Sequence, residues 1–131
     1  MGSGHRKVSF PTGRASLAEV LADRDLASLG DAYVNFAYSL VLSDKRKKPL
    51  GVRVKGSVLA EALRKAGLRG QLGSRMTRHS LADAAEAVIA YAWLNGYVTL
   101  DESVMIMKKG KDAVEGISAL LETVKKRVTF P

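Results

Sequence analysis

The sequence predicts an all-α fold in the form of a helical bundle. Two long stretches, from Asp25 to about Leu42 and from about Ser80 to Asn95, are apolar around most of a helical circumference. Strand-like alternation of apolar and polar residues is absent over any useful length. Helix start and stop signals divide the remainder of the chain, so we expect a bundle of about five to seven helices.

The length of 131 residues is enough for one hydrophobic core. We expect residues 1–13 to be a disordered or tag-like N-terminus and residues 14–131 to form a single domain. The first residues lack the apolar stretch of a secretory signal, and no apolar run approaches the roughly 20 residues of a membrane span. The absence of cysteine excludes disulfides and thiolate metal sites, and it favours a cytoplasmic protein.

Each expected element has a local cause. Ser16-Leu17-Ala18-Glu19 has the form of a capping box and predicts a short first helix. The second helix runs from Asp25 to about Leu42. Because Lys45 to Lys55 contains Pro49 and Gly51, this segment is expected to be a basic loop or a very short strand.

Glycines mark the expected ends of the helices in the second half of the chain. A helix beginning at Gly56-Ser57 is expected to stop at Gly67, and residues 70–78 are expected to be irregular. The apolar helix over about 80–95 stops at Asn95-Gly96. A last helix spans about 101–127, with Gly110 as a candidate break, and its apolar run 104–107 fits either core packing or a contact between two copies.

Basic residues are concentrated between Lys45 and Arg78. This segment holds eleven basic residues and one acid, Glu61, whereas the rest of the chain holds ten basic and twelve acidic residues. A solubilising surface usually mixes both signs. The near-absence of interleaved acids therefore favours a polyanionic partner, most often nucleic acid.

Three carboxylates lie on the two apolar helices. Asp31 is the only charge between Leu26 and Leu42, and Asp83 and Glu86 are three residues apart and share a helix face. An ionised carboxylate is costly to bury unless it is paired or bound to a cation. Oxygen-only clusters suit hard ions such as Mg²⁺ or Mn²⁺.

Simpler interpretations fit the same spacing. Ser28, Asp31, Asn35 and Ser39 share a stripe and also fit the solvated edge of their helix. Residues 80–83 also fit a capping box at a helix start, and Glu86 also fits a pair with a nearby arginine. Periodicity alone leaves these alternatives open.

Two blocks of sequence resemble the ribonuclease III family. Residues 29–36, LGDAYVNF, resemble the L-G-D-A-V-L-x-F core of the family signature, and residues 81–94, LADAAEAVIAYAWL, resemble its A-D-x-x-E-A-L-I-G-A-I-Y-L block. The blocks occur in the family's order and with about its separation, and the resemblance covers roughly residues 17–97. The chain is similar to the short Mini-III branch, which has no separate double-stranded-RNA-binding module.

The resemblance implies a ribonuclease III-like helical bundle and a metal-dependent endoribonuclease that acts on double-stranded or structured RNA as a homodimer. Ribosomal and transfer RNA precursors are candidate substrates. Asp31 and Glu86 take the catalytic roles, and with Asp83 they take the roles of Mg²⁺ or Mn²⁺ ligands. Where the signature has a glutamate four residues before the aspartate, this chain has Ala27, which bears on the number of metal ions and on activity.

A-form RNA is recognised mainly through its phosphates and 2′-hydroxyls. The residues expected to make these contacts are Lys45, Arg46, Lys47, Lys48, Arg53, Lys55, Arg75 and Arg78. Two other hypotheses remain open: a non-catalytic ribonuclease III-like RNA-binding protein, for which Ala27 would be the mark, and a helical interaction module that binds an acidic protein.

Overall fold

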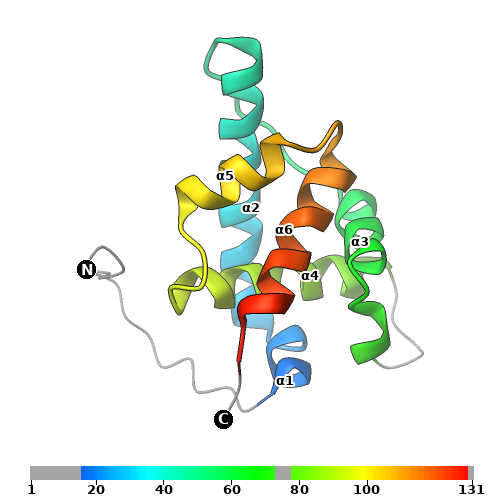
Figure 1. Ribbon diagram of the computed structural model, residues 1–131. Coiled ribbons are helices and arrows are strands. Elements are labelled where there is room, and N and C mark those ends of the chain that lie inside the picture. The colour runs from blue at the N-terminus through cyan, green and yellow to red at the C-terminus, as the bar shows by residue number, and fades with distance from the viewer. Residues whose placement is uncertain (1–15, 73–77, 130–131) are drawn as a thin grey trace.

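The most apolar helix of the chain, α4 (Arg78–Leu94), runs through the centre of the structure (Figure 1). The computed structural model describes residues 16–72 and 78–129. Between Leu81 and Leu94, every residue of α4 except Asp83 and Trp93 is buried. A helix that is apolar on all sides needs neighbours on all sides, and α1, α2, α3 and α6 all pack against it.

Five further α-helices surround α4. Together with one short 3₁₀ helix, they are α1 (Leu17–Leu21), α2 (Arg24–Arg46), α3 (Gly56–Lys65), η1 (Arg69–Gln71), α5 (Leu100–Lys108) and α6 (Ala113–Arg127). Buried apolar side chains from all six α-helices form one core. The described ranges contain no strand, so the predicted all-α bundle is confirmed. None of the described helices combines the length and the apolar character needed to cross a membrane.

Helix α2 is longer than the sequence predicted. It begins where the Asp23 carboxylate accepts a hydrogen bond from the Leu26 amide at 2.9 Å, and it ends at Lys47 with a φ of 59°. The expected end near Leu42 was wrong, and Lys45 and Arg46 lie in the last helical turn instead of in a loop. Positive charge is favourable there because the C-terminal end of a helix dipole is negative.

The last predicted helix is divided in two. Helix α5 ends at Lys108 and α6 begins at Ala113, so the candidate break at Gly110 is confirmed. A side chain at Gly110 would overlap the backbone of Gly116, which explains why a glycine is needed at this position. The Asp112 carboxylate then caps α6 by accepting a hydrogen bond from the Glu115 amide at 2.9 Å.

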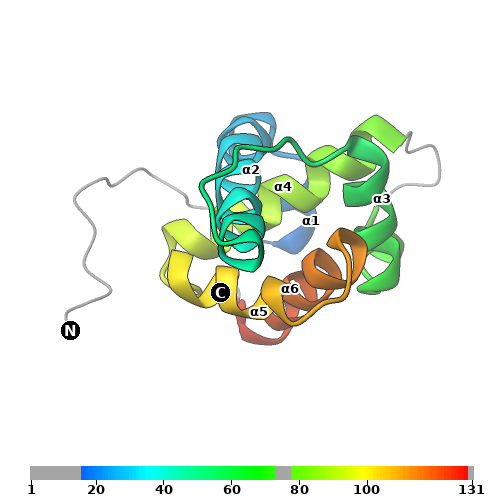
Figure 2. The same ribbon diagram turned by 90° about the horizontal axis from the view of Figure 1, so that it is seen from above.

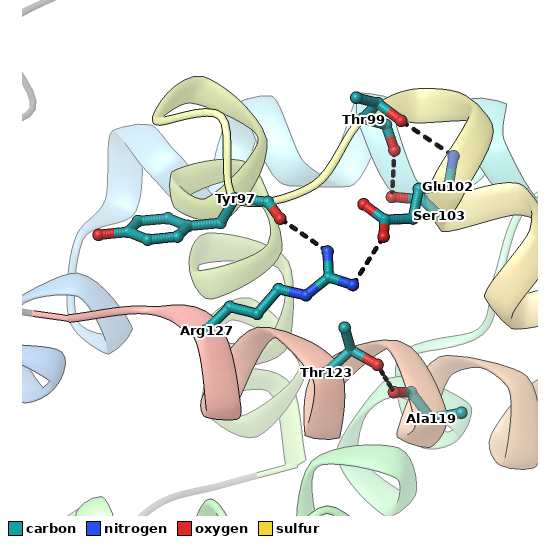
Figure 3. A network of polar contacts seen from close by, with 7 residues as sticks. All are labelled: Tyr97, Thr99, Glu102, Ser103, Ala119, Thr123 and Arg127. Atoms are coloured by element: carbon teal, nitrogen blue, oxygen red, sulfur yellow. Dashed lines mark hydrogen bonds and ion pairs between the residues drawn. The ribbon is translucent and has the colours of Figure 1, made fainter. Parts of the chain in front are cut away.

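Arg127 ties the end of α6 to the segment between α4 and α5 (Figure 3). Its guanidinium donates to the Tyr97 carbonyl at 3.0 Å and forms an ion pair with Glu102 at 2.7 Å. Glu102 lies in the first turn of α5, whose start is capped by the Thr99 hydroxyl. This network holds the start of α5 against the end of α6.

Candidate active site

The site is built where α2 and α4 come into direct backbone contact. A Cβ atom at Gly30 would overlap the Glu86 carbonyl oxygen, so only glycine permits this approach. The facing segment of α4 is rich in alanine, and Ala82, Ala84, Ala85 and Ala87 are all buried. The next residue after Gly30 is Asp31, so the close contact brings its carboxylate to Glu86.

Glu86 and Asp31 form a hydrogen-bonded carboxyl pair. Glu86 is only 6% exposed. Burial, the hydrogen bond to Asp31 and the charges of Asp31 and Asp83, in that order of size, together raise the pKa of Glu86 to about 8. The Arg53 guanidinium acts in the opposite direction. At neutral pH Glu86 therefore keeps its proton and donates it in the hydrogen bond to Asp31.

Asn35 and Arg53 hold Asp31 from the side that faces solvent. The Asn35 side-chain amide donates to the Asp31 carboxylate at 3.2 Å, and its oxygen accepts from the Val54 amide at 2.7 Å. The Arg53 guanidinium lies 3.8 Å from Asp31, with 82% of its side chain exposed. Asp31 is thus positioned by groups from its own helix and from the extended segment that follows it.

That extended segment, residues 50–54, runs back along α2 as a strap. The amides of Leu50, Val52 and Val54 donate to side-chain oxygens of α2, from Ser43 at 2.8 Å, Ser39 at 2.9 Å and Asn35 at 2.7 Å respectively. Four helical residues rise about 6 Å and two extended residues about 6.6 Å, so the two spacings match. Arg53 lies between Val52 and Val54 in the strap, and this position brings its guanidinium close to the Asp31 carboxylate.

The polar stripe on α2 is therefore structural along most of its length. Asn35 and Ser39, which also fitted a solvated edge, hydrogen-bond the strap.

Helix α4 begins at Arg78, so Ser80 and Asp83 lie inside the helix and the capping-box interpretation of residues 80–83 was wrong. Sequence reasoning missed the strap, although the four-residue spacing of Asp31, Asn35, Ser39 and Ser43 was a signal for it.

A cleft of about 670 Å³ opens above the carboxyl pair. It is lined by the α1–α2 junction, α2, the strap and the first turns of α3 and α4, and Asp31, Arg53, Asp83 and Glu86 all face it. Ala27, the residue that departs from the ribonuclease III signature, also lines the cleft. The three carboxylates predicted from sequence thus share one cleft.

Asp31, Asp83 and Glu86 line the cleft with carboxyl oxygens, the ligand type that hard divalent cations prefer, and a cation bound there would favour loss of the Glu86 proton. In residues 16–72 and 78–129, however, no three His, Cys, Asp or Glu side chains are placed to hold a metal ion together. Asp31 and Glu86 form the close pair, and Asp83 is a half-buried third carboxylate on the same wall.

The basic residues expected to contact RNA fall into two groups. Lys45, Arg46, Lys47 and Lys48 are exposed at the free end of α2, and Arg53 and Lys55 lie on the strap and at the start of α3. Arg75 and the side chain of Arg78 lie outside the described residues.

A comparison of the sequence with models of protein families gives a match that covers both helices of the carboxyl pair. The family model described as Ribonuclease III matches residues 24–129. The chain belongs to the ribonuclease III family. The match extends beyond the two blocks that carried the resemblance, because it includes α5 and α6. No curated protein matches the ribonuclease III-like chain at a significant level.

Proposed function

We propose that the protein is a metal-dependent endoribonuclease that hydrolyses phosphodiester bonds in double-stranded or structured RNA. The observation that carries this proposal is the pair formed by half-exposed Asp31 and buried Glu86 in a cleft beside Arg53, on a chain of the ribonuclease III family. The family membership supports nuclease chemistry, and the carboxyl pair supplies a group that can carry it. Ribosomal and transfer RNA precursors are the candidate substrates.

Each residue of the cleft has a distinct part in this proposal. Asp31 and Glu86 would hold Mg²⁺ or Mn²⁺, with Asp83 as the further carboxylate. When bound, such a cation supplies positive charge at the phosphate and lowers the pKa of water. Asn35 orients the Asp31 carboxylate, and Arg53 is exposed enough to bind a phosphate oxygen of the substrate.

A non-catalytic RNA-binding protein of the same family is the second candidate. The observation that favours it is Ala27, which is 6% exposed and lines the cleft without offering a carboxylate. Under this alternative, the basic surface would bind RNA and the carboxyl pair would be a remnant of a fuller site.

Cleavage of a uniform double-stranded RNA, with and without Mg²⁺ or Mn²⁺, decides between the two candidates. We expect cation-dependent cleavage by the wild type and its loss in Asp31→Asn and in Glu86→Gln. Glu122→Gln is the matched control, because Glu122 is an exposed carboxylate on α6, outside the cleft. RNA binding with no cleavage by the wild type in either cation would establish the second candidate.

We further propose that two copies associate through the exposed face of α2 and α5. In the described part of the chain, the large apolar residues with the greatest exposure are Leu29, Phe36 and Met105, at 37%, 56% and 64%. All three lie on α2 or α5, and these helices pack against each other. Phe36 and Asp31 line one shallow hollow, so a second copy seated on this face would pair two carboxylate sites.

A further inference from the structure

Two segments far apart in the sequence meet at the free end of α2. The Lys45 ammonium donates to the Gly110 carbonyl at 3.1 Å, and Lys108 forms an ion pair with Asp44. These contacts join the end of α2 to the turn between α5 and α6, and Figure 2 looks down on this end of the molecule. The exposed basic residues gathered there, which we name the tip surface, are Lys45, Arg46, Lys47, Lys48, Lys108, Lys109 and Lys111.

The tip surface has an excess of positive charge. Three acids lie among its seven basic residues, and each of them is engaged. Asp44 pairs with Lys108, the Asp112 carboxylate accepts from an amide of α6, and the Glu115 carboxylate accepts from the Lys111 amide at 3.1 Å. Lys108, Lys109 and Lys111 lie outside the basic segment recognised from sequence, so the structure enlarges that segment into a surface.

The tip surface and the carboxyl pair lie on the same helix at a fixed separation. Fourteen residues of α2 separate Asp31 from Lys45, which corresponds to about 21 Å. Between them runs the strap, which carries the exposed Arg53 beside Asp31. If the duplex runs parallel to α2, its phosphates advance by roughly 3 Å of axis per base pair, so the separation corresponds to roughly seven base pairs.

We propose that the tip surface binds the phosphate backbone of the RNA at roughly seven base pairs from the bond that is cut, and so sets a minimum duplex length for tight binding. This inference rests on the proposed function, because it places the cut at the carboxyl pair. The phosphate backbone is the favoured occupant because the tip surface is lysine-rich and its seven exposed basic residues outnumber the three acids among them, which suits contact through charge.

The test compares Lys109→Ala/Lys111→Ala with Lys65→Ala/Lys126→Ala. Both double variants remove two exposed charges, but Lys65 and Lys126 lie near the ends of α3 and α6, away from the tip surface (Figure 1). Binding is measured in EDTA, which prevents cleavage, to RNA stem-loops of about five and about twenty base pairs over a range of salt concentrations. Circular dichroism confirms that each variant is folded.

We expect the Lys109/Lys111 variant to bind the long stem roughly tenfold more weakly, with a salt slope reduced by about two, and to bind the short stem as the wild type does. The Lys65/Lys126 variant should match the wild type on both stems. An unchanged slope for the long stem, equal weakening on both stems, or equally effective competition by polyglutamate at matched charge would overturn the proposal.

The two proposals fail in different ways. If the wild type binds the long stem through the tip surface but does not cleave it in Mg²⁺ or Mn²⁺, the inferred surface stands and the endonuclease proposal fails. If the wild type cleaves RNA and the Lys109/Lys111 variant binds like the control, the endonuclease stands and the tip surface is not a binding site. If the wild type does not bind RNA at all, both the endonuclease proposal and the tip-surface proposal are contradicted.

Discussion

Glu86 is a carboxyl group that the fold buries in its protonated form, so its titration changes the stability of the protein. Its pKa is about 8 in the folded protein and near 4.5 in an unfolded chain. The folded state therefore keeps a proton that the unfolded state has already lost, so the contribution of Glu86 to stability is fully present below about pH 4.5 and is lost as the pH rises to about 8.

We expect the urea midpoint of the wild type, measured in EDTA, to fall between pH 5.5 and pH 8 relative to that of Glu86→Gln, in which this titration is absent. Other groups titrate in both proteins, so the difference between the two midpoints isolates Glu86. A difference that is constant over this pH range, or that grows in favour of the wild type, would show that Glu86 is not buried as a protonated group.

The packing of α2 against α4 depends on the absence of a side chain at Gly30. Gly30→Ala forces a methyl group into the Glu86 carbonyl oxygen, so α2 and α4 must separate. We expect a loss of about 3 kcal/mol in the free energy of unfolding, at the upper end of overpacking effects. Nuclease activity should fall as well, because the same contact sets the separation of Asp31 and Glu86.

Gly56→Ala is the matched control for this prediction. A Cβ at Gly56 would meet the Ala82 Cβ at 3.8 Å, which is an ordinary contact. Since alanine is favoured over glycine in a helix by roughly 0.5–1 kcal/mol, this variant should be as stable as the wild type or more stable. Equal stability of Gly30→Ala and Gly56→Ala in urea would contradict the close approach of α2 and α4.

At the scale of elements, the strap is held by side chains of α2, which accept the amide hydrogen bonds that a neighbouring strand would accept in a sheet. The Ser39 hydroxyl accepts from the Val52 amide and donates to the Asn35 carbonyl at 2.7 Å, so Ser39→Ala leaves the Val52 amide without its acceptor. We expect a loss of about 1–2 kcal/mol in the free energy of unfolding and faster hydrogen exchange at the Val52 amide.

Thr123→Ala serves as the control for the strap. The Thr123 hydroxyl donates to the Ala119 carbonyl within its own helix at 3.0 Å, and no loop amide is shown to depend on it (Figure 3). Its removal should leave the exchange of the Val52 amide unchanged. Wild-type exchange at Val52 in the Ser39→Ala protein would mean that the strap is held by other groups.

The elements that the sequence predicts well are those whose cause is local. The apolar helices were found from composition along the chain, and the break at Gly110 was marked by the glycine itself. The end of α2 is predicted too early because the expected loop begins at Lys45, whereas Lys45 and Arg46 complete the last helical turn and Lys47 caps the helix with a φ of 59°. Pro49 is a correct stop signal, but it follows that cap by two residues, and basic residues are favourable at the end of a helix.

The parts of the site that escaped prediction depend on contacts between distant residues. Asn35 was noted only as one member of a polar stripe, because nothing local shows that its oxygen accepts from the Val54 amide. In the same way, Arg53 was assigned to RNA contact, and its place 3.8 Å from Asp31 requires the path of the strap. The carboxylates are conspicuous in the sequence as charges on apolar helices, but their assignment to one site rests on the resemblance to the two ribonuclease III blocks, because periodicity alone leaves other interpretations open.

At the scale of the whole molecule, charge and apolar exposure occupy different surfaces. The tip surface lies at the free end of α2, whereas Leu29, Phe36 and Met105 lie along the sides of α2 and α5. On α2 the two surfaces are separate, because Phe36 precedes Lys45 by nine residues, whereas on α5 they adjoin, because Met105 lies one helical turn from Lys108. We expect the oligomeric state to depend on the apolar residues of α2 more than on salt.

The last prediction concerns Phe36, the apolar residue of this face that lines a shallow hollow together with Asp31. If two copies meet here, Phe36→Glu places like charges at a shared apolar centre, and the dissociation constant should rise by about 30-fold or more. Sedimentation equilibrium should give twice the chain mass of 14.1 kDa for the wild type and the single mass for the variant. Ala18→Glu, which adds the same charge at an exposed position of α1, should remain dimeric. A wild type that sediments as a single chain at all concentrations, or a Phe36→Glu protein that stays dimeric, would mean that this face is not where two copies meet.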